Sequence, residues 1–285
     1  MRRSTPSADP HDHHDDDHDR GLAFDVGTLM ARRRALALMG GAGLLALVGC
    51  GTSSSDGTST TTAATGAATT AAAGSTTGSS GDAIPEETAG PYPGDGSNGP
   101  DALGQSGIVR KDITTSFGGS SGTAGGIPLT IRLEVGDAST GKAEEGLAVY
   151  VWHCSREGGY SMYSPGVEDQ NFLRGVQPTA GDGAATFTSI FPAAYDGRWP
   201  HVHFEVYESA DAATSGGDPI ATSQIALPKD VCEQVYGTTG YEASPANLAR
   251  VSLETDMVFA DSYQTELGTV TGSLAGYTVT LAVPV

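Results

Sequence analysis

Basic residues are scarce in this chain of 285 residues: 15 lysines and arginines stand against 34 aspartates and glutamates. The formal net charge at pH 7 is −19. Nucleic-acid binding needs clustered positive charge to neutralise phosphates, so the composition argues against a nucleic-acid partner. It fits a soluble protein with a small-molecule substrate.

Long helical patterns are scarce as well, whereas glycine is abundant at 40 residues. Short runs of alternating apolar residues recur instead, and clusters of Gly, Pro, Asp and Ser separate them. This pattern predicts an all-β fold, which we interpret as an antiparallel β-sandwich with active-site loops at one end. The most helix-like segment is 247–259. The predicted strands are 127–135, 146–154, 184–191, 201–208 and 277–283.

The start of the chain lacks the pattern of a folded domain. A basic cluster at 32–34 precedes an apolar run at 35–49, which is shorter than the ~20 residues of a membrane span. We therefore interpret residues 1–49 as an n-region and signal peptide. The run ends in Leu-Val-Gly before Cys50, which resembles a bacterial lipobox and implies lipidation of Cys50.

Residues 50–82 are almost entirely Ser, Thr, Gly and Ala, a composition that cannot bury an apolar core. We expect a disordered linker here and a single β-sandwich domain over residues 83–285, with folded structure beginning near Ile84. The signal-peptide pattern and the lipobox-like motif predict an exported lipoprotein. It would be held at the outer face of the bacterial cytoplasmic membrane only through Cys50, or released outside the cell. General or twin-arginine export both stay open, as does the oligomeric state.

Cysteine is rare, with three in the chain. Once Cys50 is assigned to lipid attachment, Cys154 and Cys232 are left in the exported part. Outside the cytoplasm two cysteines can form a disulfide. A Cys154–Cys232 bridge and two buried free thiols both stay open, because sequence does not supply the geometry.

Histidine is also sparse in the folded part, yet His201 and His203 lie two residues apart on one predicted strand. Side chains alternate across a strand, so both imidazoles point to the same face and can reach one metal ion. Taken alone, such a pair is also common among ordinary surface residues.

Two tyrosines strengthen the metal interpretation. Tyr195 lies in a turn-rich loop six positions before His201, and Tyr160 lies in the loop after a central strand. Phenolate is a hard, anionic donor that favours Fe(III) over Fe(II) or Zn(II). Histidine together with phenolate therefore predicts a ferric site.

Five motifs together resemble the intradiol ring-cleavage dioxygenases. They are ETAGPYP (87–93), VWHCSREGGY (151–160), FTSIFPAAY (187–195), GRWPHVHF (197–204) and SQIALP (223–228). The resemblance covers roughly residues 86–232. By motif position it implies Fe(III) as the cofactor and assigns the metal ligands as Tyr160, Tyr195, His201 and His203.

The same resemblance implies roles for three further residues. Arg198 and Gln224 stabilise charge on the reacting ring, Arg198 also binds substrate, and Tyr92 lines the substrate pocket. Tyr195 is the ligand that takes a substrate proton. A structural ion pair is the simpler alternative for Arg198.

The sequence departs from the family pattern near the first tyrosine. His153 follows the tryptophan where the family usually has glutamine, and Gly159 stands where an arginine often precedes the ligand. We expect His153 as an additional polar group near the pocket. Tyr163 competes with Tyr160 for the ligand role, and the motif spacing favours Tyr160.

The implied reaction inserts O2 into a catechol-type ring and gives a muconate-type product. Two alternatives are weighed against it. The first is a non-catalytic cell-surface β-sandwich that binds a carbohydrate or a protein. The second is a zinc or iron hydrolase in which Glu205, on the histidine face of the strand, serves as the base.

Overall fold

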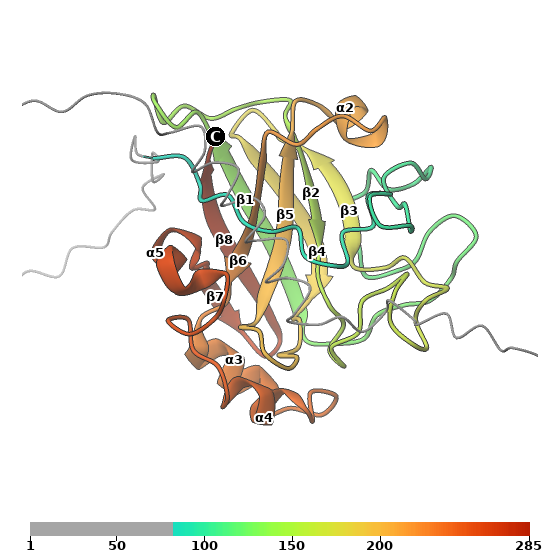
Figure 1. Ribbon diagram of the computed structural model, residues 1–285, viewed down its shortest axis with the longest axis vertical. Helices are drawn as coiled ribbons and strands as arrows, with labels where there is room; N and C mark the ends of the chain where they lie inside the picture. The colour runs from blue at the N-terminus through green and yellow to red at the C-terminus, as the bar shows by residue number, and fades with distance from the viewer. Residues whose placement is uncertain (1–81) are drawn as a thin grey trace, which may run out of the picture.

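The computed structural model describes residues 82–285, and most of its regular structure is strand. Two four-stranded sheets pack against each other, one in the order β4-β1-β8-β7 and the other in the order β3-β2-β5-β6 (Figure 1). The strands are β1 (Pro128–Gly136), β2 (Ala148–Trp152), β3 (Arg174–Pro178), β4 (Ala184–Ile190), β5 (His201–Tyr207), β6 (Ala221–Ala226), β7 (Thr269–Ser273) and β8 (Gly276–Pro284).

The predicted all-β sandwich is confirmed. Neighbouring strands are antiparallel except for β1 and β8, which run parallel with Leu129 opposite Tyr277. A parallel pair needs a long connection. Here the whole second sheet and the helical segments lie between β1 and β8 in the sequence.

The main core lies between the sheets. β1 alternates buried and half-buried residues, as a strand with one covered face should. Its Ile131 and Leu133 share one buried apolar cluster with Phe187 of β4 and with Val202 and Phe204 of β5. Truncation of a buried phenylalanine such as Phe204 to alanine typically costs about 3–5 kcal/mol.

The second sheet is covered on its outer face as well. β2, β5 and β6 are buried along their whole length. In Figure 1 the N-terminal stretch, coloured teal, runs across these strands. Backbone and side-chain hydrogen bonds attach it: Glu87 N–H donates to the Thr222 carbonyl, and the Tyr150 hydroxyl donates to the Pro93 carbonyl. The histidine face of β5 is therefore enclosed.

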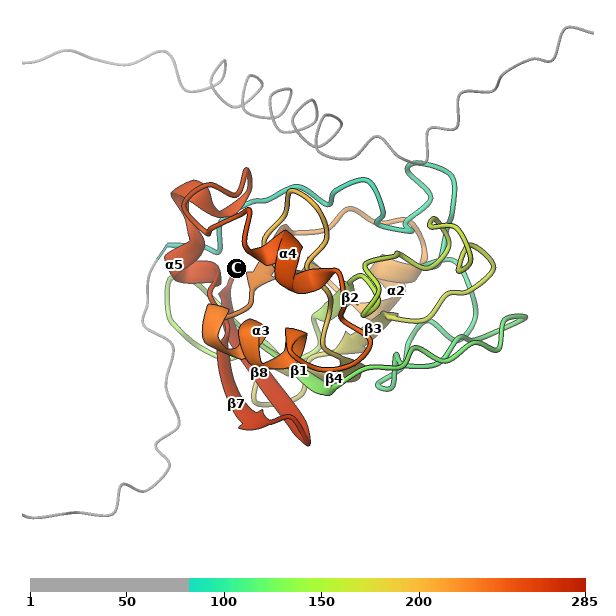
Figure 2. The same ribbon diagram turned by 90° about the horizontal axis from the view of Figure 1, so that it is seen from below.

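Helices are short and lie mainly between β5 and β7. They are α2 (Ala210–Thr214), α3 (Lys229–Tyr236), α4 (Ser244–Leu248), the 3₁₀ helix η2 (Phe259–Asp261) and α5 (Tyr263–Glu266). α2 follows β5 at one end of the sandwich, and α3 and α4 lie together at the other (Figures 1 and 2).

The five predicted strands match β1, β2, β4, β5 and β8 within a few residues. The helical interpretation of 247–259 is wrong over most of that range, because α4 ends at Leu248 and η2 begins only at Phe259. Ser252, Thr255 and Asp256 bond their side chains to nearby backbone N–H groups or hydroxyls, and such bonds compete with helix formation.

Folded structure is present at Ile84, which is buried and donates its backbone N–H to Pro284. The predicted signal peptide, lipobox and most of the linker lie outside the described residues. Within 82–285, no helix is both long enough and apolar enough to cross a bilayer.

Cys154 and Cys232 are both buried and both free, so of the two open possibilities the structure has the pair of thiols. Burial raises the pKa of the Cys154 thiol to about 12, and it also raises that of Cys232. Neither is set up as a thiolate nucleophile.

Candidate metal centre

The four predicted ligands converge on one point. From Nε2 of His201, the hydroxyl of Tyr195 lies at 3.3 Å, the hydroxyl of Tyr160 at 3.5 Å and Nε2 of His203 at 3.1 Å. Two phenol oxygens and two imidazole nitrogens thus gather from three separate segments. Had these four side chains lain far apart, they could not have shared one metal ion, but in the structure they lie together.

Strand geometry places the two histidines. Val202, Phe204 and Val206 of β5 point into the core between the sheets. Since side chains alternate, His201 and His203 point to the opposite face. Both are nearly inaccessible to solvent, at 2% exposure each.

Loops bring the tyrosines to this face. Tyr160 follows β2 and is buried, with its backbone N–H bonded to the Ser164 hydroxyl. Two residues further on, Met162 has φ +73°, a left-handed conformation that costs a non-glycine residue energy. Tyr195 follows β4 and is half-buried. The two ligands therefore differ in solvent access.

Hydrogen bonding fixes the tautomer of His201. Its Nδ1 lies 2.5 Å from the Trp199 carbonyl, which only accepts, so Nδ1 carries the proton. The lone pair of Nε2 then faces the tyrosine hydroxyls. Burial and the charge of Arg198 lower the pKa of His201 to about 3. A neutral imidazole with an oriented lone pair is the form that binds metals.

His203 is also held neutral, because burial and then His201 lower its pKa well below the usual value. Its ring stacks on Trp152, with centroids 4.9 Å apart and planes 4° apart. Nδ1 of His203 has no hydrogen-bond partner among the described residues. Burial, followed by the neighbouring Tyr195, raises the pKa of Tyr160 well above its ordinary value.

These residues fit a bound metal ion. Ligands about 2.0–2.1 Å from a metal lie roughly 3 Å from one another, which is close to the observed 3.1–3.5 Å separations. Within residues 82–285, His, Cys, Asp and Glu form no group of three that could hold a metal. The fit therefore depends on the two tyrosines, and phenolates select hard trivalent cations.

Arg198 lies beside the ligands and is fixed on two sides. Its Nε donates to Asp256 at 3.0 Å and its Nη2 donates to the Gln224 side-chain oxygen at 2.7 Å. The Gln224 amide donates in turn to the Thr88 carbonyl. The structure thus contains the ion pair that was the simpler alternative for Arg198, and it also joins Arg198 to Gln224.

Tyr92 packs over Tyr160, the first candidate ligand. Its ring lies 4.8 Å from the ring of Tyr160 and 5.2 Å from that of Tyr163. The hydroxyl of Tyr163 donates to the Asn98 side chain and accepts from Gly94 N–H, so it serves the N-terminal segment. Of the two competing tyrosines, Tyr160 is the one beside the histidines.

The expectation for His153 is wrong. This residue is buried, with Nε2 2.6 Å from the Ser189 hydroxyl and Nδ1 2.8 Å from the Cys154 carbonyl. Trp152 faces the ligands, and strand alternation turns the next residue to the other side, toward β4. His153 is thus a satisfied core histidine.

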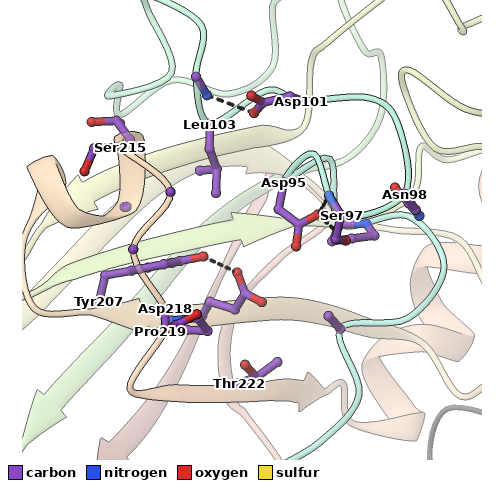
Figure 3. A pocket seen from close by; sticks show the side chains of 18 of the residues that line it. Asp95, Ser97, Asn98, Asp101, Leu103, Tyr207, Ser215, Asp218, Pro219 and Thr222 are labelled. Atoms are coloured by element: carbon purple, nitrogen blue, oxygen red, sulfur yellow. Dashed lines mark hydrogen bonds between the residues drawn. The ribbon is translucent and has the colours of Figure 1, made fainter.

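A cavity of about 870 Å³ opens elsewhere on the same sheet, toward α2 (Figure 3). Its lining includes no lysine, arginine or histidine and none of the four candidate ligands. Glu205 lies there and accepts a hydrogen bond of 2.6 Å from Tyr207, the next residue on that face. Glu205 is therefore turned away from the histidine pair, which speaks against the hydrolase alternative. The acidic residues that line the cavity are Glu86, Asp95, Asp101, Glu205 and Asp218.

Sequence reasoning missed three residues that shape the centre. Trp152, on the predicted strand 146–154, stacks on the candidate ligand His203. Asp256 holds Arg198, and its carboxylate belongs to a segment expected to be helical. Arg174 is fully buried and donates to the carbonyls of Tyr92 and Ser161. No local motif marked Asp256 or Arg174, because their partners lie far away in sequence.

Comparison with known proteins agrees with this arrangement. No family model matches the chain. A stretch of 58 residues is 40% identical to chlorocatechol 1,2-dioxygenase of Rhodococcus opacus, and it spans 20% of this chain and 23% of that relative.

Solved structures match over most of the described region. An intradiol ring-cleavage dioxygenase from Tetranychus urticae is 25% identical with a TM-score of 0.55, over 71% of this chain and 94% of that one. Another solved dioxygenase, 24% identical, has a TM-score of 0.57 over 72% and 94% of the two chains. The resemblance found in the motifs is therefore confirmed: in sequence and in fold, this chain is similar to the intradiol ring-cleavage dioxygenases.

Proposed function

We propose that this chain is an iron(III)-dependent dioxygenase that opens catechol-type rings by intradiol cleavage, with a catechol and O2 as substrates. The observation that carries the proposal is that two phenol oxygens and the Nε2 of His203 all lie within 3.5 Å of the Nε2 of His201. Similarity to known intradiol dioxygenases supports it.

Tyr160, Tyr195, His201 and His203 would hold the metal. When bound there, iron(III) supplies the Lewis acidity that lowers the pKa of catechol hydroxyls and accepts electron density from the ring. Two phenolates also offset two of its three positive charges. With a divalent ion the two phenolates would already cancel the whole charge of the metal, which would leave no net positive charge to attract an anionic catecholate.

The two tyrosines are suited to different tasks. Tyr160 is buried and packs against Tyr92, so it is held in place. Tyr195 is half-buried and lies on a turn-rich loop. We assign Tyr195 as the group that accepts a proton from the substrate hydroxyl, because its oxygen has more room to move.

Arg198 and Gln224 supply electrostatic stabilisation. Arg198 places a buried positive charge next to the ligands, where the low dielectric strengthens its attraction to a negatively charged ring. The carboxamide of Gln224 is fixed at both ends by Arg198 and the Thr88 carbonyl. Because both groups are already oriented, little reorganisation is needed when charge develops.

Tyr92 contributes an aromatic wall. Its ring is 4.8 Å from that of Tyr160, and the carbonyl of Tyr92 accepts from buried Arg174. An aromatic surface fixed beside the ligands suits a flat aromatic substrate. It also helps to keep water away from the reacting ring.

The proposed location is the outer face of the cytoplasmic membrane, with the domain tethered through lipidated Cys50. The motif before Cys50 supports this proposal. Expression of the full chain with a labelled fatty acid should label the protein, whereas Cys50→Ser should abolish the label. Unlabelled wild-type protein in a bacterial host that lipidates a known lipoprotein would contradict lipidation.

The function is tested by oxygen uptake and product spectra with a panel of catechols. Iron-loaded protein should be coloured, consume one O2 per catechol and form a muconate-type product. Tyr160→Phe and His203→Ala should each lower activity by at least about 10–100-fold, because substitution of residues that merely hold metal ligands in place already costs that much. Both variants should also lose colour.

Tyr277→Phe is the matched control. Tyr277 is buried in the core between the sheets, away from the candidate ligands, so its colour and turnover should match the wild type. A protein that takes up iron without visible colour and consumes no oxygen with any catechol would contradict the proposed function.

A further inference from the structure

Asp256 lies at the centre of a buried hydrogen-bond network beside the candidate ligands. Its side chain is fully buried. One carboxylate oxygen, Oδ2, accepts from Arg198 Nε at 3.0 Å and from Trp199 N–H at 2.7 Å. The other, Oδ1, accepts from the backbone N–H groups of Val258 at 2.9 Å and Phe259 at 3.2 Å.

We propose that Asp256 is a positioning residue for the reaction, whose one carboxylate orients both Arg198 and, through the Trp199 peptide, the ligand His201. The inference rests on the proposed function for its catalytic meaning. It adds a residue 53 or more positions away from each of the four candidate ligands, on a segment without a strand.

The first part of the proposal concerns Arg198. A free arginine side chain rotates about several bonds, and the loss of this freedom is costly. Here Asp256 holds Nε and Gln224 accepts from Nη2, so two edges of the planar guanidinium are fixed. The Phe259 ring, 5.9 Å from the guanidinium carbon, lies against it. The same carboxylate bonds the backbone of Phe259, so it sets this contact too.

The second part concerns His201. Trp199 N–H donates to Asp256, and the Trp199 carbonyl accepts from His201 Nδ1. These two groups belong to one residue, whose indole N–H also donates to the Leu227 carbonyl. The orientation of that backbone therefore decides the direction of the imidazole and the aim of its Nε2 lone pair.

The third part concerns charge. Of the ion pairs in residues 82–285, the Arg198–Asp256 pair has both side chains buried, at 2% and 0% exposure, whereas the partners of the others are considerably more exposed. A buried ion pair is weak support for stability alone, and fixed geometry is the better-attested use. The pair thus ties the positive charge of Arg198, beside the candidate ligands, to the turn in which Asp256 bonds the backbone of Val258 and Phe259.

The test compares Asp256→Asn with a matched control, Asp196→Asn. Asp196 is an exposed carboxylate on the loop next to Tyr195 and pairs with Arg250 at the surface, so its substitution makes the same charge change nearby. We expect Asp256→Asn to keep its iron content, to shift the visible absorption band, and to lower kcat by about 10–100-fold with a smaller change in KM. The control should stay within about twofold of wild type.

A double-variant cycle separates positioning through Arg198 from a general loss of stability. If Asp256 acts mainly on Arg198, then adding Asp256→Asn to Arg198→Gln should reduce kcat by no more than about threefold further. A full independent loss in that background would overturn the Arg198 part, and an unshifted band in Asp256→Asn would overturn the His201 part.

Failure of the inference is distinguishable from failure of the proposed function. If wild-type protein turns over catechol and folded Asp256→Asn matches it in kcat, KM and spectrum, Asp256 is structural only. If wild-type protein is inactive, the band of the iron-loaded protein still tests the His201 part. Should Asp256→Asn not accumulate as folded protein, Asp256→Glu keeps the charge while displacing the contacts, and the same shift in band and kcat is expected.

Discussion

Trp152 lies flat on His203, with ring centroids 4.9 Å apart and an angle of 4° between the planes. The two residues are direct partners across β2 and β5. Tyr150 stacks on Trp152 at 4.9 Å, so the imidazole is the last of three layered rings. The sheet itself therefore fixes the plane of one candidate metal ligand.

Removal of that surface should weaken the metal site. Trp152→Ala should lower the free energy of unfolding by about 3–5 kcal/mol and reduce iron affinity, because His203 loses the wall against which it is oriented. Urea unfolding measures the change in stability. An iron titration at urea concentrations below the unfolding midpoint measures the change in iron affinity. Phe187→Ala, in the core between the sheets, should lose similar stability while keeping iron affinity.

Trp152→Phe should be much milder. The indole N–H of Trp152 has no hydrogen-bond partner among the described residues, so phenylalanine removes a buried unsatisfied donor while it keeps an aromatic face. We expect a loss below about 2 kcal/mol. A loss of stability as large as that of Trp152→Ala would contradict this expectation.

Loading with iron should stabilise the fold, because the ligands come from separate segments. A free metal concentration about 1,000-fold above Kd contributes about 4 kcal/mol, which for a domain of this size raises Tm by roughly 10 °C. Thermal melts before and after chelator treatment measure this. His203→Ala should melt at the same temperature in both conditions, and an equal shift in that variant would place the iron elsewhere.

Glu266 should make stability depend on pH. Burial, followed by the repulsion of Asp261 and Asp256, raises its pKa to about 7, against hydrogen bonds from Ser262 and Ser223. The unfolded chain loses this proton at about pH 4.5, so stability from this group is complete below that pH and falls as pH rises through 7. The total change is about 3 kcal/mol.

Glu266→Gln copies the protonated carboxyl and should flatten that dependence. Denaturant unfolding at a series of pH values from 4.5 to 8 compares the two proteins. The variant should be the more stable one near pH 8, and the two should be similar near pH 4.5. Parallel pH profiles would show that Glu266 has an ordinary pKa.

Arg174 should matter both for stability and for substrate affinity. Its guanidinium is buried and donates to the carbonyls of Tyr92, Pro93 and Ser161 at 2.8–2.9 Å. Arg174→Met removes the donor of the Tyr92 and Ser161 carbonyls, whereas the Pro93 carbonyl keeps the Tyr150 hydroxyl. We therefore expect a loss of about 3–5 kcal/mol and, in the folded fraction, a higher KM because Tyr92 is released. Arg132→Met, at a more exposed pair, should cost no more than about 1 kcal/mol.

The two cysteines should behave as protected thiols. Cys154 and Cys232 are buried and free, and burial raises the pKa of each thiol. Peptide mapping should find both alkylated in denaturant but neither in native protein, and a reducing agent should leave Tm unchanged. A disulfide-linked peptide containing both residues would contradict this prediction.

The strands of the sandwich could be predicted from sequence because alternation is a local property. In 127–135 and 201–207 the period of two is written directly in the residues, and it also places His201 and His203 on one face. β3, β6 and β7 were missed, since β3 and β6 are mostly buried on both faces and β7 is largely exposed, and none of them alternates clearly.

The sequence alone thus determined the strand-rich class, the shared face of the histidines and the donor types of Tyr160 and Tyr195, because chemistry and strand period need no knowledge of distant neighbours. Only the tertiary structure decided that the four donors meet at one point, that His153 turns into the core, and that Asp256 holds Arg198. The Tyr160–His201, His153–Ser189 and Asp256–Arg198 contacts join residues 36 to 58 positions apart. Their existence depends on how the loops and sheets pack, which residue spacing along the chain does not encode.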